Sequence, residues 1–264
     1  MYPIRMMLRK IRRRVASWLK VSAPSQQRRG LGPWGFAGHP DQAFGPLTYA
    51  QFGEDMILAN VFALRGIEKP SFLDIGAHHP VNCSNTALLY ARGARGVCVE
   101  ANPNLIEAFQ DLRPEDRIVN IGCGVAEGTL DFYMIDHASG RNTFDRTTAE
   151  AFVTAHPEFR IREIRRIAVL TLDQIVALHC GGRWPDLLSL DIEGLDYAVL
   201  QASHFDYMQG PKIICVETVS GADYQQGSAI ENLLVERGYT MLGRTLANMI
   251  FGANEAKTIA TGAS

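Results

Sequence analysis

The sequence predicts an α/β domain with a doubly wound, mostly parallel sheet that ends in an antiparallel hairpin. Apolar runs of strand length alternate with helical patterns from about residue 50 onward, which is typical of a parallel sheet. Two short apolar segments then close the pattern around Gly243, whereas a plain dinucleotide-binding fold ends in a strand and a helix. Of the 264 residues, 47% are hydrophobic and 20% are charged, so one core of ordinary composition can form.

The first 21 residues predict a basic amphipathic helix. Ile4, Leu8, Ile11 and Val15 follow one another at steps of four, three and four, which places them on one stripe. Residues 1–30 hold nine of the 26 Lys and Arg residues and no acid. Such a helix can lie on an anionic membrane, dock on the acidic remainder of the chain or on a second subunit, or stay a solvated tail. It lacks the continuous apolar segment of a secretory signal.

A linker is expected over residues 22–47, where four prolines and five glycines interrupt any regular pattern. The folded domain is expected over residues 48–252, followed by a flexible tail at 253–264. Its first helix covers residues 56–64, with Glu54 and Asp55 in the first turn, where the macrodipole favours negative charge.

The remaining elements follow in order from apolar periodicity and from capping residues. We expect strands at 72–75, 96–99, 117–121, 129–135, 167–170, 187–192, 213–217, 239–242 and 248–251, and helices at 85–92, 103–112, 171–178, 197–202 and 229–237. The polar loop at 141–144 is either an acceptor-binding loop or an ordinary connection.

The charge distribution and the cysteines limit the partners and the compartment. Residues 31–264 hold 17 basic and 28 acidic residues, so nucleic acid is not an expected partner. Five cysteines without a C-x-x-C pair indicate a reducing, cytoplasmic location. No apolar run approaches the ~20 residues of a spanning helix, so membrane contact is expected only at the periphery of the inner face, through residues 1–20.

Candidate binding residues lie where the predicted strands end, because ligands of open parallel sheets bind at the carboxyl ends of the strands. Gly76 and Ala77 leave the backbone open to a ligand, and Glu100 can accept hydrogen bonds from both hydroxyls of a ribose. This pattern indicates a nucleoside. The four segments are Asp74-Ile-Gly-Ala-His78, Glu100-Ala-Asn-Pro103, Asn120-Ile-Gly122 and Asp191-Ile-Glu-Gly194.

The kind of nucleoside follows from residues that are missing. The first turn has one glycine in place of the three of G-x-G-x-x-G, and the chain has no G-x-x-x-x-G-K-[ST]. Asp74 would repel a phosphate but suits a cationic ligand with an amino acid group. S-adenosylmethionine, with its sulfonium, ammonium and ribose diol, fits these charges. An NAD-dependent oxidoreductase is the alternative, since it also needs an acid after its second strand.

The motifs resemble those of the FkbM family of S-adenosylmethionine-dependent methyltransferases, over about residues 48–252. The resemblance implies a class I methyltransferase (Rossmann-like) fold with a seven-stranded sheet, and O-methylation of hydroxyls of sugars, glycans or natural products. A non-catalytic scaffold on this fold is a further alternative. The matching segments are Gln51-Phe-Gly-Glu-Asp55, Phe72-Leu-Asp-Ile-Gly-Ala77, Ser84-Asn-Thr86, Gly96-Val-Cys-Val-Glu-Ala-Asn-Pro103, Asn120, Leu190-Asp-Ile-Glu-Gly194 and Val216-Glu217.

The resemblance also implies roles for single residues. The methionine side would be lined by Asp74, Gly76 and Ala77, the ribose side by Glu100 and Ala101 together with Asn102, and the adenine side by Asn120 and Ile121. The pocket would be closed by Gln51, Glu54 and Asp55, and Asp191 and Glu193 would face the methyl-transfer site.

An alcohol is a poor nucleophile at neutral pH, so the reaction needs a general base. Asp191 with Glu193 close by is the expected base, and His78 is the alternative. The chain departs from many relatives at His79 and Pro80, where a glycine is common, so loop contacts cannot be transferred there. We expect no metal, because adjacent histidines point apart on extended backbone and no third ligand follows at a known spacing.

Overall fold

The structure is a computed structural model, and it describes residues 48–137, 140–218 and 224–254. The predicted basic helix over 1–21 and the linker over 22–47 lie outside the described residues, as does the predicted tail beyond residue 254.

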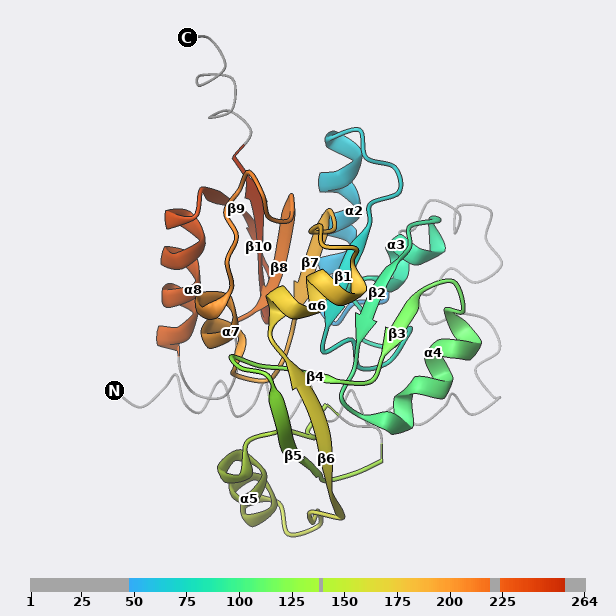
Figure 1. Cartoon of the computed structure of the whole chain (residues 1–264), viewed down its shortest axis with the longest axis vertical. Helices are drawn as coiled ribbons and strands as arrows, with labels where there is room; N and C mark the ends of the chain where they lie inside the picture. The colour runs from blue at the N-terminus through green and yellow to red at the C-terminus, as the bar shows by residue number, and fades with distance from the viewer. Residues whose placement is uncertain (1–47, 138–139, 219–223, 255–264) are drawn as a thin grey trace, which may run out of the picture. The chain divides into compact units, whose positions relative to one another are not determined.

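A seven-stranded sheet forms the body of the domain (Figure 1), with the strand order β3-β2-β1-β7-β8-β10-β9. The first five of these strands run parallel, and β10 pairs antiparallel with both β8 and β9. This confirms the doubly wound sheet and the terminal hairpin. The strands are β1 (Phe72–Ile75), β2 (Gly96–Val99), β3 (Arg117–Val119), β7 (Leu187–Leu190), β8 (Ile213–Glu217), β9 (Tyr239–Arg244) and β10 (Asn248–Ala253).

The register of the central strands positions the site. Ile75 at the end of β1 pairs with Val99 at the end of β2 and with Leu190 at the end of β7. The three following loops therefore start side by side. The chain order reverses at β1, which is the switch point where ligands bind in open α/β sheets.

Helices cover both faces of this sheet, because successive strand residues point to opposite sides. Leu73 and Ile75 of β1 belong to the core under α6, α7 and α8, whereas Phe72 belongs to the core under α2, α3 and α4. In Figure 1, α6 crosses in front of the sheet and α2 lies behind it. The helices are α2 (Glu54–Leu64), α3 (Ala87–Ala91), α4 (Ile106–Leu112), α6 (Leu172–His179), α7 (Asp196–Ala202) and α8 (Tyr224–Glu236).

An insertion between β3 and α6 forms a second sheet of three strands. The sequence predicted two of these strands, at 129–135 and 167–170, but not that they form a separate sheet. Its order is β4-β6-β5, with β4 (Gly122–Cys123), β5 (Gly128–Met134) and β6 (Glu163–Leu170). A missed helix, α5 (Arg146–Ala155), packs on it, and Asp145 caps this helix by accepting from the backbone N–H groups of Thr147 and Thr148. In Figure 1 the insertion extends below the main sheet.

Several predicted boundaries are wrong. The hairpin turns at residues 245–247, where the Thr245 N–H donates to the Asn248 carbonyl, and Gly243 is instead a ladder residue opposite Ile250. Helix α8 starts at Tyr224 rather than at residue 229, and β6 starts at Glu163 rather than at 167. The helix predicted for 103–112 opens with a 3₁₀ turn, Pro103–Leu105, because the Asn102 side chain caps Asn104 there.

Candidate active site

The loops after β1 and β7 are in direct backbone contact. Gly76 has a φ of 76°, and a Cβ placed on it would lie 1.8 Å from the carbonyl oxygen of Asp191. The Gly76 and Ala77 N–H groups donate to the Val99 carbonyl at 3.0 and 3.1 Å. The Asp191 N–H donates to the Ile75 carbonyl at 3.0 Å. The ends of β1, β2 and β7 are thus held as one unit, which brings Asp74, Gly76, Ala77, Glu100 and Asp191 together.

Glu100 is held by two backbone donors. Its Oε2 accepts from His78 N–H at 2.7 Å, and its Oε1 accepts from Asn102 N–H at 2.6 Å. Each carboxylate oxygen can accept more than one hydrogen bond, so both can also accept from a diol. Burial raises the pKa of Glu100 to about 7, and the negative charges of Asp74 and Asp191 add to this effect.

Asp74 lies below this loop, 4% exposed. Its Oδ2 accepts from the Thr86 hydroxyl at 2.5 Å. Burial raises the pKa of Asp74, while the hydrogen bond from Thr86 and the positive charge of Arg113 act in the opposite direction.

A group of carboxylates follows β7. Burial raises the pKa of Asp191 to about 6, although a hydrogen bond with Glu217 at the end of β8 favours ionisation. The Glu193 side chain is exposed to solvent on one side. Partial desolvation by the neighbouring residues and the negative charge of Asp191 raise its pKa to about 7. Its φ of 55° is unusual for a non-glycine residue, and such backbone strain is concentrated at functional sites.

Asp196 has a mainly structural position in this group. Its carboxylate accepts from the N–H groups of Ile192 and Gly194, both at 3.1 Å, and so closes the loop that carries Glu193. Burial raises the pKa of Asp196 to about 7.

The amino-terminal motif packs beside these carboxylates, with its own oxygens already bonded. Glu54 accepts from Thr245 Oγ1 at 2.5 Å and from Asn248 Nδ2 at 3.1 Å, and its charge also acts on Asp191. Asp55 holds the segment before α2 by accepting from Thr48, Tyr49 and Ala50, whereas Gln51 is exposed. The predicted closing role of this motif stays a prediction.

The residues expected on the adenine side form an edge next to the insertion. Asn120 is exposed, and its Nδ2 donates to the carbonyls of Glu100 at 2.8 Å and Ala101 at 3.0 Å. Ala101 packs against Phe132 and Met134 of the insertion, and Ile121 packs against the main core. This arrangement combines an apolar wall with polar backbone atoms, as a purine site requires.

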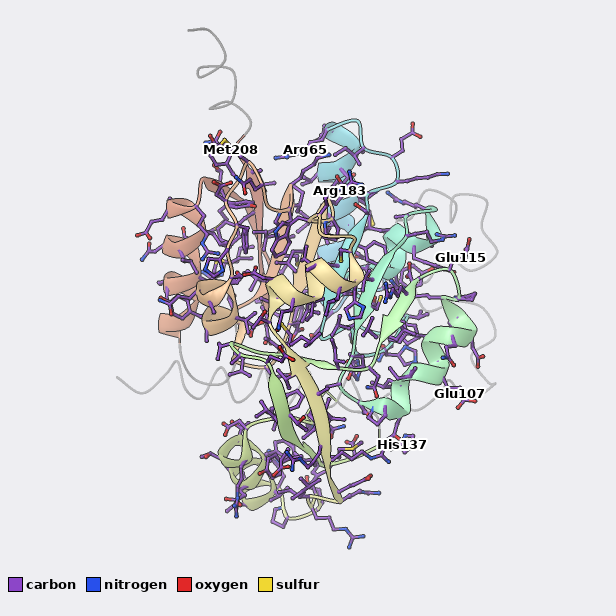
Figure 2. All side chains as sticks on the ribbon, in the orientation of Figure 1. Arg65, Glu107, Glu115, His137, Arg183 and Met208 are labelled. Atoms are coloured by element: carbon purple, nitrogen blue, oxygen red, sulfur yellow. The ribbon has the colours of Figure 1, made fainter. Side chains whose placement is uncertain are left out.

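The insertion is attached to the β2 loop by hydrogen bonds to the His137 carbonyl. Asn102, 1% exposed, donates to this oxygen through Nδ2 at 3.0 Å, and Asn104 donates to it at 3.1 Å. Figure 2 shows His137 between α4 and the insertion. The loop at 141–144 is held against the end of β5, where the buried Asn142 accepts from the N–H groups of Ile135 and Asp136.

The two adjacent histidines have different environments. The backbone N–H of His78 serves Glu100, as described above. His79 Nδ1 accepts from the N–H groups of Val81 at 3.1 Å and Asn82 at 3.0 Å, which requires a neutral imidazole. Burial lowers the pKa of His79. Within the described residues, no group of three His, Cys, Asp or Glu side chains is arranged to hold a metal.

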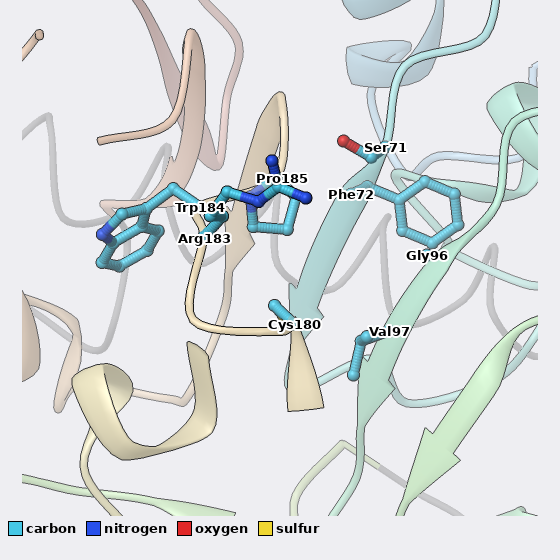
Figure 3. Close-up of a pocket in the computed structure, with 8 residues that line it drawn as sticks. All are labelled: Ser71, Phe72, Gly96, Val97, Cys180, Arg183, Trp184 and Pro185. Atoms are coloured by element: carbon cyan, nitrogen blue, oxygen red, sulfur yellow. The ribbon is translucent and has the colours of Figure 1, made fainter. Parts of the chain in front are cut away.

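A cavity of about 390 Å³ lies at the opposite edge of the sheet, where β1 and β2 begin (Figure 3). In Figure 3 the rings of Phe72 and Trp184 point away from each other, and Trp184 packs on Phe205 at 4.8 Å between ring centroids. The carboxylates described above do not line it; they lie at the other edge, where the loops after β1, β2 and β7 start. The cavity is lined by Ser71, Phe72, Gly96, Val97, Cys180, Arg183, Trp184 and Pro185.

The residues present fit a nucleoside that carries positive charge. The charges of Asp74 and Asp191 raise the pKa of Glu100, and the charge of Asp74 also raises that of Asp191, so a nearby cation would offset this repulsion. Glu100 supplies two fixed oxygens for a ribose diol. Because Gly76 has no side chain, the backbone of the β7 loop can approach the turn closely.

Sequence reasoning missed three residues of this site. Glu217 reaches Asp191 from β8, Thr86 bonds to Asp74, and Asp196 closes the β7 loop. Thr86 and Glu217 belong to segments used for the resemblance, but nothing in the sequence shows that their partners are carboxylates far along the chain.

The sequence matches the family described as Methyltransferase FkbM domain over residues 74–241. No curated protein matches it.

Similar solved structures include a protein described as an RNA methyltransferase from Pyrococcus horikoshii, with 12% identity, a TM-score of 0.40, and coverage of 79% of this chain and 91% of that one. A TehB-like SAM-dependent methyltransferase from Corynebacterium glutamicum has 11% identity and a TM-score of 0.41, with 81% and 92% coverage. A protein described as a caffeoyl-CoA O-methyltransferase from Staphylococcus aureus has 9% identity and a TM-score of 0.43, with 81% and 88% coverage. Because these TM-scores are low, the fold assignment rests on the strand order of the sheet.

Proposed function

The chain belongs to the FkbM family of methyltransferases, and from this premise we propose that it methylates a hydroxyl group of a sugar, a glycan or a natural product. S-adenosylmethionine is the methyl donor of this family. The observation that carries the proposal is the convergence of Asp74, Glu100 and Asp191 on the Gly76 turn.

We assign the site residues as follows. Asp74, Gly76 and Ala77 hold the methionine part of the donor, and Glu100 with Ala101 and Asn102 holds the ribose. Asn120 and Ile121 border the adenine, next to the apolar wall of the insertion. The amino-terminal motif of Gln51, Glu54 and Asp55 closes the pocket from α2, supported by the charge interaction between Glu54 and Asp191.

The donor supplies an electrophilic methyl group on a sulfonium. Methyl transfer is a displacement in line with the leaving group, so the protein contributes mainly by orienting the acceptor and by excluding water. We assign to Asp191 and Glu193 the orientation of an acceptor hydroxyl and the removal of its proton. Their raised pKa values of about 6 and about 7 suit a general base near neutral pH.

His78 is the second candidate for the base, because it follows the Gly76 turn directly. Its φ of 51° shows that the backbone is held in an uncommon conformation there. A His78→Gln variant that loses turnover while Asp191→Asn retains it would transfer the role to His78.

A titration with two competing ligands tests this function. Calorimetry with S-adenosylhomocysteine should show saturable binding, and NADH should not displace it. Saturable NADH binding without S-adenosylhomocysteine binding would favour the oxidoreductase. Methyl release with a panel of sugars, glycans and natural products, followed by mass spectrometry for products heavier by one CH₂ group, then separates an enzyme from a scaffold.

We also propose that the basic segment over residues 1–21 contacts a membrane surface. Among the described residues, no helix is long and apolar enough to cross a bilayer. The amphipathic pattern of residues 1–20 favours contact with an anionic surface, where each Lys or Arg contributes about 1 kcal/mol. Sedimentation with phosphatidylglycerol vesicles should pellet the full chain more than a chain that starts at residue 31, and phosphatidylcholine vesicles should pellet neither. Equal pelleting of both chains would contradict membrane contact.

A further inference from the structure

Arg113, at the end of α4, is 2% exposed. Its Nε donates to Asp116 Oδ2 at 2.8 Å, and its Nη2 lies 2.7 Å from the same oxygen. A buried charge without a partner costs several kcal/mol, so this ion pair is required for burial. The guanidinium is also enclosed by the rings of Phe72, Tyr90 and Phe109, at 5.3–5.5 Å from their centroids.

The rest of the guanidinium points toward the loop after β1. Nη1 donates to the Pro80 carbonyl at 3.3 Å and to Ser84 Oγ at 3.4 Å. Nη2 donates to Thr86 Oγ1 at 3.1 Å. One side chain thus holds the loop at three positions, on the segment where the sequence departs from many relatives.

The bond to Thr86 determines the direction of the next hydrogen bond. Arginine has donors but no acceptor, so the Thr86 oxygen must accept from it. The single hydroxyl proton of Thr86 is then directed at Asp74 Oδ2, 2.5 Å away. This arrangement needs an accepting oxygen on Asp74 and therefore favours the ionised carboxylate.

We propose that Arg113 is a positioning residue for the methyl donor, acting through the Thr86 hydroxyl to hold Asp74 oriented and ionised beneath the donor site. This inference rests on the proposed function, since it assigns Asp74 to the donor. Arg113 provides the positive charge that acts on Asp74, against the negative charges of Asp116, Glu100 and Asp191. The thiols of Cys98 and Cys215 also interact with this network, as does the Tyr90 ring that packs on Arg113.

The direction in which Thr86 and Arg113 change the pKa of Asp74 can be measured. Both Thr86 and Arg113 lower the pKa of Asp74, so removing either raises it. A cationic donor then meets a protonated Asp74 at a higher pH than in the wild type. The loss of affinity is therefore concentrated on the acidic side of the pH range.

The test is calorimetric titration of the full chain with S-adenosylhomocysteine, which keeps the ammonium group, from about pH 5.5 to about pH 8.5. Thr86→Val removes the hydroxyl and leaves the ion pair of Arg113 and Asp116 in place. We expect several-fold weaker binding at the acidic end, with little change at the alkaline end, because loss of the Thr86 hydrogen bond raises the pKa of Asp74. Thr86→Ser should restore the wild-type profile.

Two further variants distinguish an effect on Asp74 from a general loss of stability. Arg113→Lys keeps the positive charge but loses the planar guanidinium with its several donors, so it should destabilise the fold. At the acidic end of the pH range, its affinity for S-adenosylhomocysteine should stay closer to that of the wild type than the affinity of Thr86→Val does. Cys98→Ala removes a contact of Arg113 at 3.4 Å without touching Thr86, and its pH profile should match the wild type.

The outcomes are distinct. An unchanged profile for Thr86→Val, or a loss of affinity of equal size at every pH, would overturn the positioning role. Wild-type protein that binds no S-adenosylhomocysteine at any pH would instead overturn the proposed function. If Arg113→Lys does not fold, the comparison of Thr86→Val with Thr86→Ser tests the proposal.

Discussion

The carbonyl oxygen of Asp191 occupies the space that any side chain on Gly76 would need, 1.8 Å from an ideal Cβ. This contact joins the donor side of the site to the carboxylate expected to activate the acceptor. Backbone packing, rather than a side-chain bond, therefore sets the distance between the two halves of the site.

Gly76→Ala should consequently destabilise the domain more than the loss of a glycine alone. Gly66 is the matched control, because its φ of 69° is similar but nothing lies within 4 Å of its Cβ position. In urea unfolding, we expect about 1 kcal/mol for Gly66→Ala and several kcal/mol for Gly76→Ala. Equal losses would show that the β7 loop moves aside at little cost.

Glu100→Gln should weaken binding of S-adenosylhomocysteine by about 1.5–3 kcal/mol, the usual range for hydrogen bonds to a charged group. Glu107→Gln, on the exposed surface of α4 (Figure 2), is the control and should bind as the wild type does. Wild-type affinity in the Glu100 variant, measured by calorimetry, would remove the ribose assignment.

Asp191→Asn should retain donor binding and lose roughly 10²- to 10⁴-fold in turnover, the usual contribution of a general base. In the wild type, turnover should rise with pH through the region of pH 6 to 7, because the base must be deprotonated and the pKa values of Asp191 and Glu193 are about 6 and about 7. Turnover that is flat across this region, or that survives the substitution, would assign proton removal to another group.

The raised carboxylate pKa values also predict how stability depends on pH. Glu100 and Asp196 have folded pKa values of about 7, against ordinary values of 4.5 and 3.8, so the folded state holds their protons more tightly. The stability from these groups is therefore complete below about pH 4 and is lost as pH rises to about 7. Asp145 and Asp186 have lowered pKa values, so the stability that they contribute is lost only at lower pH, as the pH falls below about 4.

Urea unfolding without ligand should accordingly show a free energy of unfolding that falls between about pH 4.5 and about pH 7. The fall should be shallower in Glu100→Gln, whatever the absolute stability of that variant. A slope that is the same in both proteins would show that Glu100 ionises normally in the folded chain.

Much of the main sheet was predictable, because strands such as Phe72–Ile75 and Ile213–Glu217 are short, mostly apolar runs that each contain one acidic residue. The insertion was predicted only in part. The strands expected at 129–135 and 167–170 correspond to β5 and to the second half of β6, whereas helix α5 and the separate sheet were missed. Its short partner strand, Gly122–Cys123, is too brief to give a periodic pattern.

The site was predictable to the same degree. The residues at strand ends could be found by position alone, because the topology of the sheet brings those ends together. Arg113 could not, since its role depends on contacts with residues 80–86 that only the folded chain creates.

A crystal structure of the protein with S-adenosylhomocysteine tests the central claim most directly. We predict the ribose hydroxyls within hydrogen-bond distance of both Glu100 oxygens, with the amino acid part over Gly76 and Asp74. Adenosine bound instead in the cavity between Phe72 and Arg183, at the opposite edge of the sheet, would contradict the account.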